Sequence, residues 1–98
     1  MIYKYNLGMP YKTPMDKITI PAPRVTINRI LDIQMQGLYA VLWAEVSPSE
    51  FDDQIVVKSV WTGYQEPLDM VYISTVQEPE TGLVYHYYVE LPLENFDV

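Results

Sequence analysis

The sequence predicts an all-β fold, either a small antiparallel sandwich or a partly open barrel. Three observations support this prediction. Apolar and polar residues alternate in most segments, turn residues recur at short intervals, and no segment has the spacing of an amphipathic helix. Seven short strands or fewer are expected, with at most one helical turn. A chain of 98 residues leaves no room for a second core, so residues 1–98 are expected to form one domain.

The N-terminal third contains two predicted strands. Residues 1–7, "MIYKYNL", are rich in β-forming side chains and predict the first strand. Residues 8–16 contain two prolines and no periodicity, which predicts a loop. Residues 17–21, "KITIP", alternate and are expected to end as a strand at Pro21. Proline has no N–H for a sheet ladder, so Pro21 and Pro23 argue against a continuing central strand.

Residues 29–46 give the clearest element, a hairpin with Gly37 at its turn. Alternation in both halves predicts that one face is buried. The side chains expected on that face are Leu31, Ile33, Met35, Leu42, Ala44 and Val46. The second half also carries Tyr39 and Trp43 on its other face, which predicts a central strand covered on both sides.

The remaining segments predict three more strands. Residues 47–54, "SPSEFDDQ", are the one place where a helical turn is expected, because serine caps and acidic residues suit a helix N-terminus. Residues 55–61, 71–77 and 83–91 read as strands, joined by "TGYQEPLDM" and by the turn "EPETG". In the last strand the core face is expected to carry Leu83, Tyr85, Tyr87, Val89 and Leu91. The wetter face would carry Val84, His86, Tyr88 and Glu90.

The composition excludes several classes of function. The net charge of −7 repels phosphate backbones, so general nucleic-acid binding is not expected. The absence of cysteine rules out disulfides, thiolate zinc sites and a cysteine nucleophile. With no signal-peptide core and no spanning apolar run, we expect a soluble cytoplasmic chain without membrane contact.

No constellation for catalysis is evident. The chain has no nucleophile elbow, no phosphate-cradling glycine loop and no calcium-loop spacing, and its carboxylates at 50–53 and 78–80 are expected to be solvated loop charge. His86 is the single histidine, so half a metal site with Glu90 would lack a second nitrogen ligand. We therefore expect a protein that is not an enzyme, with no cofactor and no metal.

The stretch "VWTGYQEP" is the first candidate binding site. Backbone N–H groups at a turn on Gly63 could meet an anion or a base edge, and Trp61 and Tyr64 could stack on a planar ligand. Alternatively, Thr62 and Gly63 only reverse the chain while the aromatic rings cover the end of the core.

Other candidates come from charge and from tyrosine content. Arg24 and Arg29 could grip a carboxylate or phosphate, or could simply pair with acidic neighbours. His86 could act as an acid–base group or as a cross-strand hydrogen-bonding residue. Nine tyrosines, among them Tyr39 and Tyr88, suit an interface, although tyrosine is also a good strand former.

Several segments together resemble a family of short phage-encoded and bacterial proteins of unknown function. The similarity covers residues 2–90 and rests on the segments "IYKY", "ILDIQMQG…LWAEV", "WTGYQEP", "YISTVQ" and "LVYHYYVE". In that family a hairpin ends in a tryptophan-alanine pair, here Trp43 and Ala44, and a final strand carries a histidine, here His86. Tyr64 departs from the pattern, because histidine often follows the threonine-glycine pair. The resemblance implies a compact β-rich fold in a phage setting and no particular activity.

These observations together favour a non-enzymatic accessory protein. The first hypothesis is a counter-defence or host-takeover inhibitor that blocks a basic surface of a host protein in the host cytoplasm. The second is a protein that sequesters a signalling nucleotide, a nucleotide sponge, which could be a homo-oligomer. The base would stack on Trp61, Tyr64 or Tyr88, and Arg24 or Arg29 would meet the phosphate. The third is a minor virion component.

Overall fold

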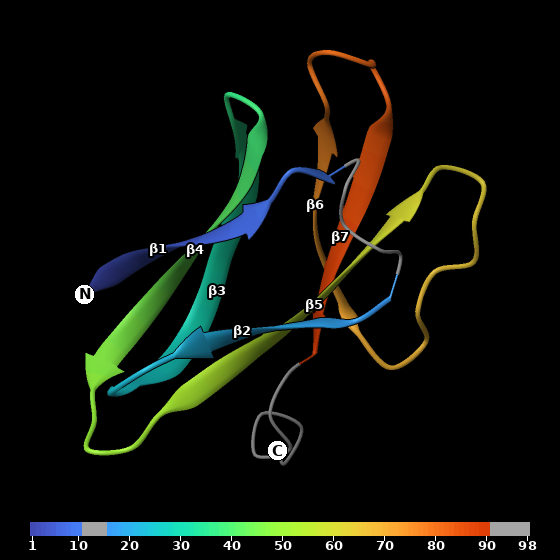
Figure 1. The fold of residues 1–98 in the computed structure, drawn as a ribbon. Coiled ribbons are helices and arrows are strands. Elements are labelled where there is room, and N and C mark those ends of the chain that lie inside the picture. The colour runs from blue at the N-terminus through green and yellow to red at the C-terminus, as the bar shows by residue number, and fades with distance from the viewer. Residues whose placement is uncertain (11–15, 91–98) are drawn as a thin grey trace.

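In the part of the chain that the structure describes, seven strands form two antiparallel sheets, and these sheets do not close into a barrel (Figure 1). The computed structural model describes residues 1–10 and 16–90. The strands are β1 (Ile2–Gly8), β2 (Ile18–Ala22), β3 (Val25–Gln36), β4 (Tyr39–Pro48), β5 (Asp53–Trp61), β6 (Val71–Gln77) and β7 (Val84–Glu90). The all-β prediction is confirmed. Residues 11–15 of the predicted loop at 8–16, and Leu91 of the last predicted strand, lie outside the described residues.

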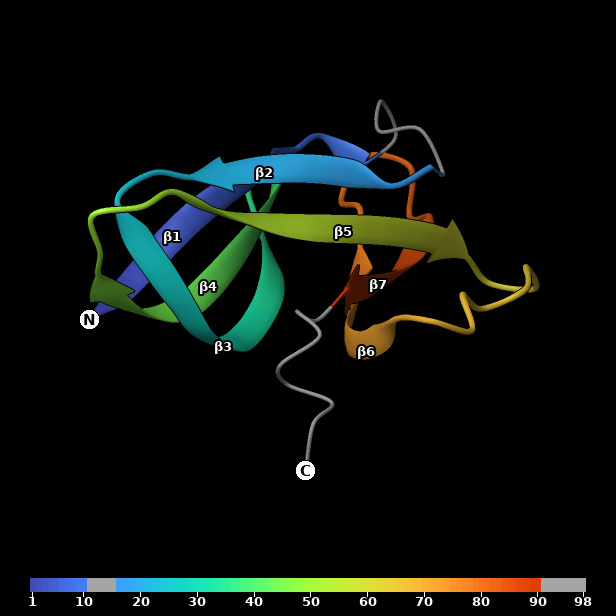
Figure 2. The same cartoon turned by 90° about the horizontal axis from the view of Figure 1, so that it is seen from below.

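The sheets have the orders β1-β4-β3 and β2-β5-β7-β6. Figure 2 shows β2 and β5 side by side, with β3 and β4 beneath one of their ends and β6 and β7 beneath the other. β2 is an edge strand, which accommodates Pro21, and it runs one residue beyond that proline to Ala22. Within residues 1–10 and 16–90, no helix is long and apolar enough to cross a membrane.

One hydrophobic core lies between the sheets and is built by both. Burial of these apolar side chains is the main force that holds the two sheets together. The three-stranded sheet contributes Leu7, Val25, Ile33, Ala40, Leu42, Ala44 and Val46. Ala22, Ile55, Val57, Val76, Tyr85, Tyr87 and Val89 come from the other sheet.

The predicted hairpin is β3 and β4, but β3 does not alternate regularly. It starts at Val25, before the predicted start at residue 29, and its register with β4 shifts at Asn28 and again at Leu31. Each shift inserts one unpaired residue, a β-bulge, which turns the following side chains to the other face. Leu31 is therefore 39% exposed, and its predicted burial was wrong. Ile30 packs against the core in its place.

The rest of the hairpin agrees with the prediction. Ile33, Leu42, Ala44 and Val46 are buried and Met35 is partly buried against the core. β4 is the central strand of its sheet, as expected. On its other face Val41 is buried, and Trp43 is partly covered by Lys4, whose Nζ lies 5.9 Å from the ring centroid.

Acidic side chains hold the corner where β2 passes into β3. Arg24 has φ of 60°, so the Pro23–Arg24 turn places a left-handed residue at a position that favours glycine. Its N–H donates to Asp52 Oδ1 at 2.9 Å, and the Ile27 N–H donates to Asp53 Oδ2 at 2.8 Å. Residues 49–52 bend without forming the one helical turn the sequence allowed. These carboxylates are structural, where solvated charge was expected.

The connection from β5 to β6 is a crossover. Both strands are antiparallel to β7, and β7 lies between them. The chain therefore returns from the level of Tyr85, opposite Trp61, to the level of Val89, opposite Val71. Residues 62–70, here named the crossover loop, make this return and swing wide of the sheet in Figure 1.

β7 has the predicted core face, with two corrections. Tyr85, Tyr87 and Val89 are buried. Leu83, expected in the core, precedes the strand and is 42% exposed. Tyr88, expected on the wetter face, is only 8% exposed, because it packs edge-on to Tyr72 at 5.7 Å on the side that the crossover loop passes.

Candidate binding site

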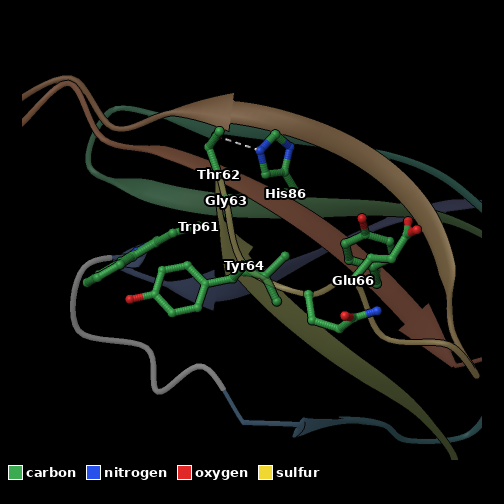
Figure 3. Close-up of a pocket in the computed structure, with 9 residues that line it drawn as sticks. Trp61, Thr62, Gly63, Tyr64, Glu66 and His86 are labelled. Carbon is green, nitrogen blue, oxygen red and sulfur yellow. Dashed lines mark hydrogen bonds between the residues drawn. The ribbon is translucent and has the colours of Figure 1, made fainter.

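An open depression of about 490 Å³ lies between the crossover loop and the outer face of β7 (Figure 3). It exists because the loop must pass β7 without pairing with it. It is lined by Val60, Trp61, Thr62, Gly63, Tyr64, Gln65, Glu66, His86 and Tyr88. We call it the polar depression.

A tight turn at Gly63 places two aromatic rings together. Gly63 has φ of 93°, and the Tyr64 N–H donates to the Trp61 carbonyl at 3.1 Å. An added Cβ would meet nothing within 4 Å, so the backbone conformation and not the available space favours glycine. The turn brings Tyr64 edge-on to Trp61, with 5.8 Å between ring centroids, as Figure 3 shows. The Trp61 ring also lies edge-on to the Tyr85 ring, with 6.3 Å between the ring centroids. We call Trp61 and Tyr64 the aromatic ridge.

His86 is held on both sides by threonine hydroxyls. Its Nε2 lies 2.8 Å from Thr62 Oγ1 and its Nδ1 lies 2.9 Å from Thr75 Oγ1. Thr75 Oγ1 in turn lies 2.7 Å from the Tyr72 hydroxyl. A neutral imidazole has one donor and one acceptor nitrogen, and the rotating hydroxyls can satisfy both. This geometry fits the hydrogen-bonding alternative and ties the base of the crossover loop to β6 and β7.

The far end of the crossover loop is anchored by Lys17. Its Nζ contacts Asp69 Oδ2 at 3.2 Å and Glu90 Oε2 at 2.9 Å. These pairs are exposed, so each stabilises the fold little. They nevertheless join the segment before β2, the loop and the end of β7. The loop thus has side-chain contacts to the sheet at both ends.

The charged side chain among the described residues that line the polar depression is that of Glu66. No lysine or arginine in the described part of the chain lines it. Glu66 is exposed and makes no ion pair with a described residue. Desolvation raises the pKa of the Tyr88 hydroxyl, and the Glu66 carboxylate and Tyr72 add to that rise. The Glu66 carboxylate therefore influences the ionisation of Tyr88, which lines the same depression.

A second depression, of about 290 Å³, lies on the other side of the aromatic ridge. Three of its lining residues, Trp61, Thr62 and Tyr64, also line the polar depression. The others are Gly82, Leu83 and Val84. Its surface is mainly apolar, and we call it the apolar depression.

The neighbouring turn contains a buried carboxylate. Glu78 has no accessible surface. Its Oε1 accepts the Glu80 N–H at 3.0 Å, and its Oε2 accepts the Thr81 N–H at 2.7 Å and the Thr81 hydroxyl at 2.8 Å. Desolvation raises the pKa of Glu78, but the hydrogen bonds from Glu80 and Thr81 together hold it below its ordinary value. The prediction of solvated charge was wrong for this residue.

The structure gathers some predicted site residues and separates others. Those at the polar depression are Trp61, Thr62, Gly63, Tyr64, His86 and Tyr88. Those elsewhere are Arg24, Arg29, Tyr39 and Trp43. Arg24 lies in the turn between β2 and β3, at the opposite end of the molecule from the last residue of β5 (Figures 1 and 2). Arg29 pairs with Glu45 at 3.3 Å on the three-stranded sheet.

Sequence reasoning missed Glu66, Leu83 and the pair Tyr72 and Thr75. Glu66 and Leu83 become site residues only through the crossover, which brings distant segments to one face. Tyr72 and Thr75 are three residues apart in a strand, and a shift in register between Tyr72 and Ser74 lets their side chains meet. No signal in a single sequence marks that irregularity.

The described residues hold no group of three or more His, Cys, Asp or Glu side chains that could bind a metal ion. No curated protein and no solved structure matches this chain. A family model, described as a domain of unknown function (DUF7352), matches residues 1–95. Because that match spans nearly the whole chain, the protein belongs to the DUF7352 family.

Proposed function

We propose that this chain is a non-enzymatic binding module that recognises a partner protein through the face around the aromatic ridge. The observation that carries the proposal is the exposed pair Trp61 and Tyr64, 38% and 59% exposed, standing between two depressions. Tryptophan and tyrosine are the residues that most often dominate binding energy at protein interfaces. Rings fixed by a turn also lose little conformational freedom on binding.

Charge favours a basic partner surface. The net charge of −7 and the carboxylate in the polar depression would both attract cationic groups. In the phage setting that the sequence resemblance implies, the partner would be a host protein. Binding would then block that protein, as a counter-defence or host-takeover inhibitor does. Roles in the virion have no supporting observation.

The nucleotide-sponge hypothesis has less support. It requires a cation near the aromatic rings to meet phosphate, but Arg24 and Arg29 lie away from the polar depression. A phosphate there would face Glu66 without a lysine or arginine among the lining residues that the structure describes. We therefore expect no rise in melting temperature with cyclic or ADP-ribose-type nucleotides.

Site-specific photo-crosslinking tests the proposal. A benzophenone amino acid replaces either Tyr64 or Tyr39, two exposed tyrosines, the first in the crossover loop and the second at the start of β4. In host cells, an adduct to one protein is expected from position 64 and not from position 39. The purified partner should then bind the native chain and bind Tyr64→Ala at least tenfold more weakly, consistent with an interface hot spot. Adducts from position 39 alone, or binding indifferent to Tyr64→Ala, would contradict it.

A further inference from the structure

We infer that the partner presents an extended segment that carries a basic side chain and an apolar side chain two residues apart, one for each depression. This inference rests on the proposed function and specifies the chemistry of the partner. It is argued from the lining of the two depressions and from the wall they share.

The polar depression suits a basic side chain. An arginine or lysine entering it would find the carboxylate of Glu66 on one side and the rings of Tyr64 and Trp61 toward the other, as Figure 3 shows. A cation near an aromatic face is attracted by the ring quadrupole, and a carboxylate beside it supplies a charged hydrogen-bond acceptor. Glu66 has no ion pair with a described residue, so binding a cation there breaks none of the described ion pairs. An acidic or phosphorylated group would be repelled.

The apolar depression suits an aliphatic side chain. Leu83 and Val84 form one side, and Trp61 with Tyr64 forms the other. Leu83 is 42% exposed, so covering it removes apolar surface from water. Among residues 1–10 and 16–90, no lysine, arginine, aspartate or glutamate lines this depression. It therefore discriminates against charged side chains.

The wall that the two depressions share sets the spacing between the two side chains of the partner. The residues common to both depressions belong to one short stretch, Trp61, Thr62 and Tyr64. A side chain on each side of one ring, each at a contact distance of about 3.5 Å, gives a separation of about 7 Å. In an extended chain, side chains on the same face recur every second residue, also about 7 Å apart. Adjacent residues point to opposite faces and cannot occupy both depressions.

The test uses capped peptides and a fluorescent reporter. In Trp43→Phe, Trp61 is the one remaining tryptophan, so its emission reports on the site. The probes are Ser-Arg-Thr-Leu-Ser and its reverse order, because the orientation of the segment is not fixed by the wall. A lysine version separates the two basic side chains. Citrulline keeps the shape of arginine without its charge, a glycine in place of leucine removes the apolar contact, and Ser-Arg-Leu-Thr-Ser changes the spacing.

The expected result is saturable binding of one of the two arginine peptides, with about tenfold weaker binding of the citrulline peptide. The glycine and adjacent-residue peptides should also bind more weakly. Glu66→Gln should weaken binding, whereas Glu50→Gln should not. Both exchanges change the net charge equally at exposed positions, so the pair separates a local contact from general attraction.

Three outcomes would overturn the inference: equal binding of arginine and citrulline, equal effects of Glu66→Gln and Glu50→Gln, or no binding of any peptide in the set. None of these depends on the crosslinking result. A partner captured specifically at position 64 together with no basic preference would leave the proposed function in place and remove only this account of the partner.

Discussion

The crossover loop and the β6–β7 turn lie at neighbouring places in the same sheet and use their carboxylates in opposite ways. The turn joins adjacent strands, so its backbone donors point inward, and Glu78 fills that space and accepts them. The crossover loop joins strands that are separated by β7, so it cannot form a tight turn between neighbouring strands. It leaves Glu66 exposed at the edge of a depression. The comparison teaches that strand order, more than residue type, decides whether an acidic residue becomes structural or available.

The largest effect is expected from removing the carboxylate of the β6–β7 turn. Glu78→Gln replaces an acceptor of three hydrogen bonds with a group whose NH₂ end faces donors, which leaves a partly buried donor unpaired. The melting temperature should fall clearly more than for Glu66→Gln or Glu80→Gln, measured by circular dichroism. A Glu78→Gln protein as stable as Glu80→Gln would show that the turn does not depend on this carboxylate.

The second effect is a dependence of stability on pH that the turn carboxylate confers. Because the pKa of Glu78 in the folded chain lies below its ordinary value of 4.5, this residue stabilises the fold above that pH. The contribution is lost as the pH falls below 4.5 and through the folded pKa. Urea unfolding from pH 6 to pH 3 should give a shallower loss in Glu78→Gln than in the native chain. The same slope in both proteins would assign acid sensitivity to other groups.

The smallest effect concerns the rate of association with the partner. Glu50, Glu66 and Glu80 make no ion pair with a described residue, whereas Asp52, Asp53 and Glu78 hold backbone donors. Neutralising the first three together should slow association and mimic high salt, since exposed charges are screened over about 8 Å at physiological ionic strength. Tyr64→Ala should mainly speed dissociation. Surface plasmon resonance at two salt concentrations separates these effects. An association rate that does not depend on salt would mean that the charge serves solubility and does not steer association.

The corner between β2 and β3 shows why the second acidic loop was also misjudged from sequence. Residues 50–53 look like solvated charge because nothing in the sequence marks the N–H groups of Arg24 and Ile27 as donors in need of a partner. Asp53→Ala should cost about 1 kcal/mol for the hydrogen bond to Ile27. A steering experiment that neutralised Asp52 and Asp53 would therefore disturb the fold along with the charge.

Alternation predicted most strands correctly because burying one face of a strand imposes a period of two. It failed at β3, where Ile30 and Leu31 are both apolar and either could have faced the core. Half of the site was predictable, since the turn at Gly63 and its two aromatic neighbours are adjacent in sequence. The contribution of β7 and the role of Glu66 were not, because both follow from the position of β7 between β5 and β6.

The two bulges in β3 have a consequence for how this family can change length. Asn28 and Leu31 each stand opposite no residue of β4, so losing either one removes an irregularity and leaves the pairs on both sides matched. Losing Ile33, which pairs with Leu42, would instead shift the register of part of the strand by one residue. Core-facing side chains there would then face solvent. Single-residue deletions among homologous chains should therefore concentrate at positions 28 and 31. Residues 32–36, which all pair with β4, should be spared.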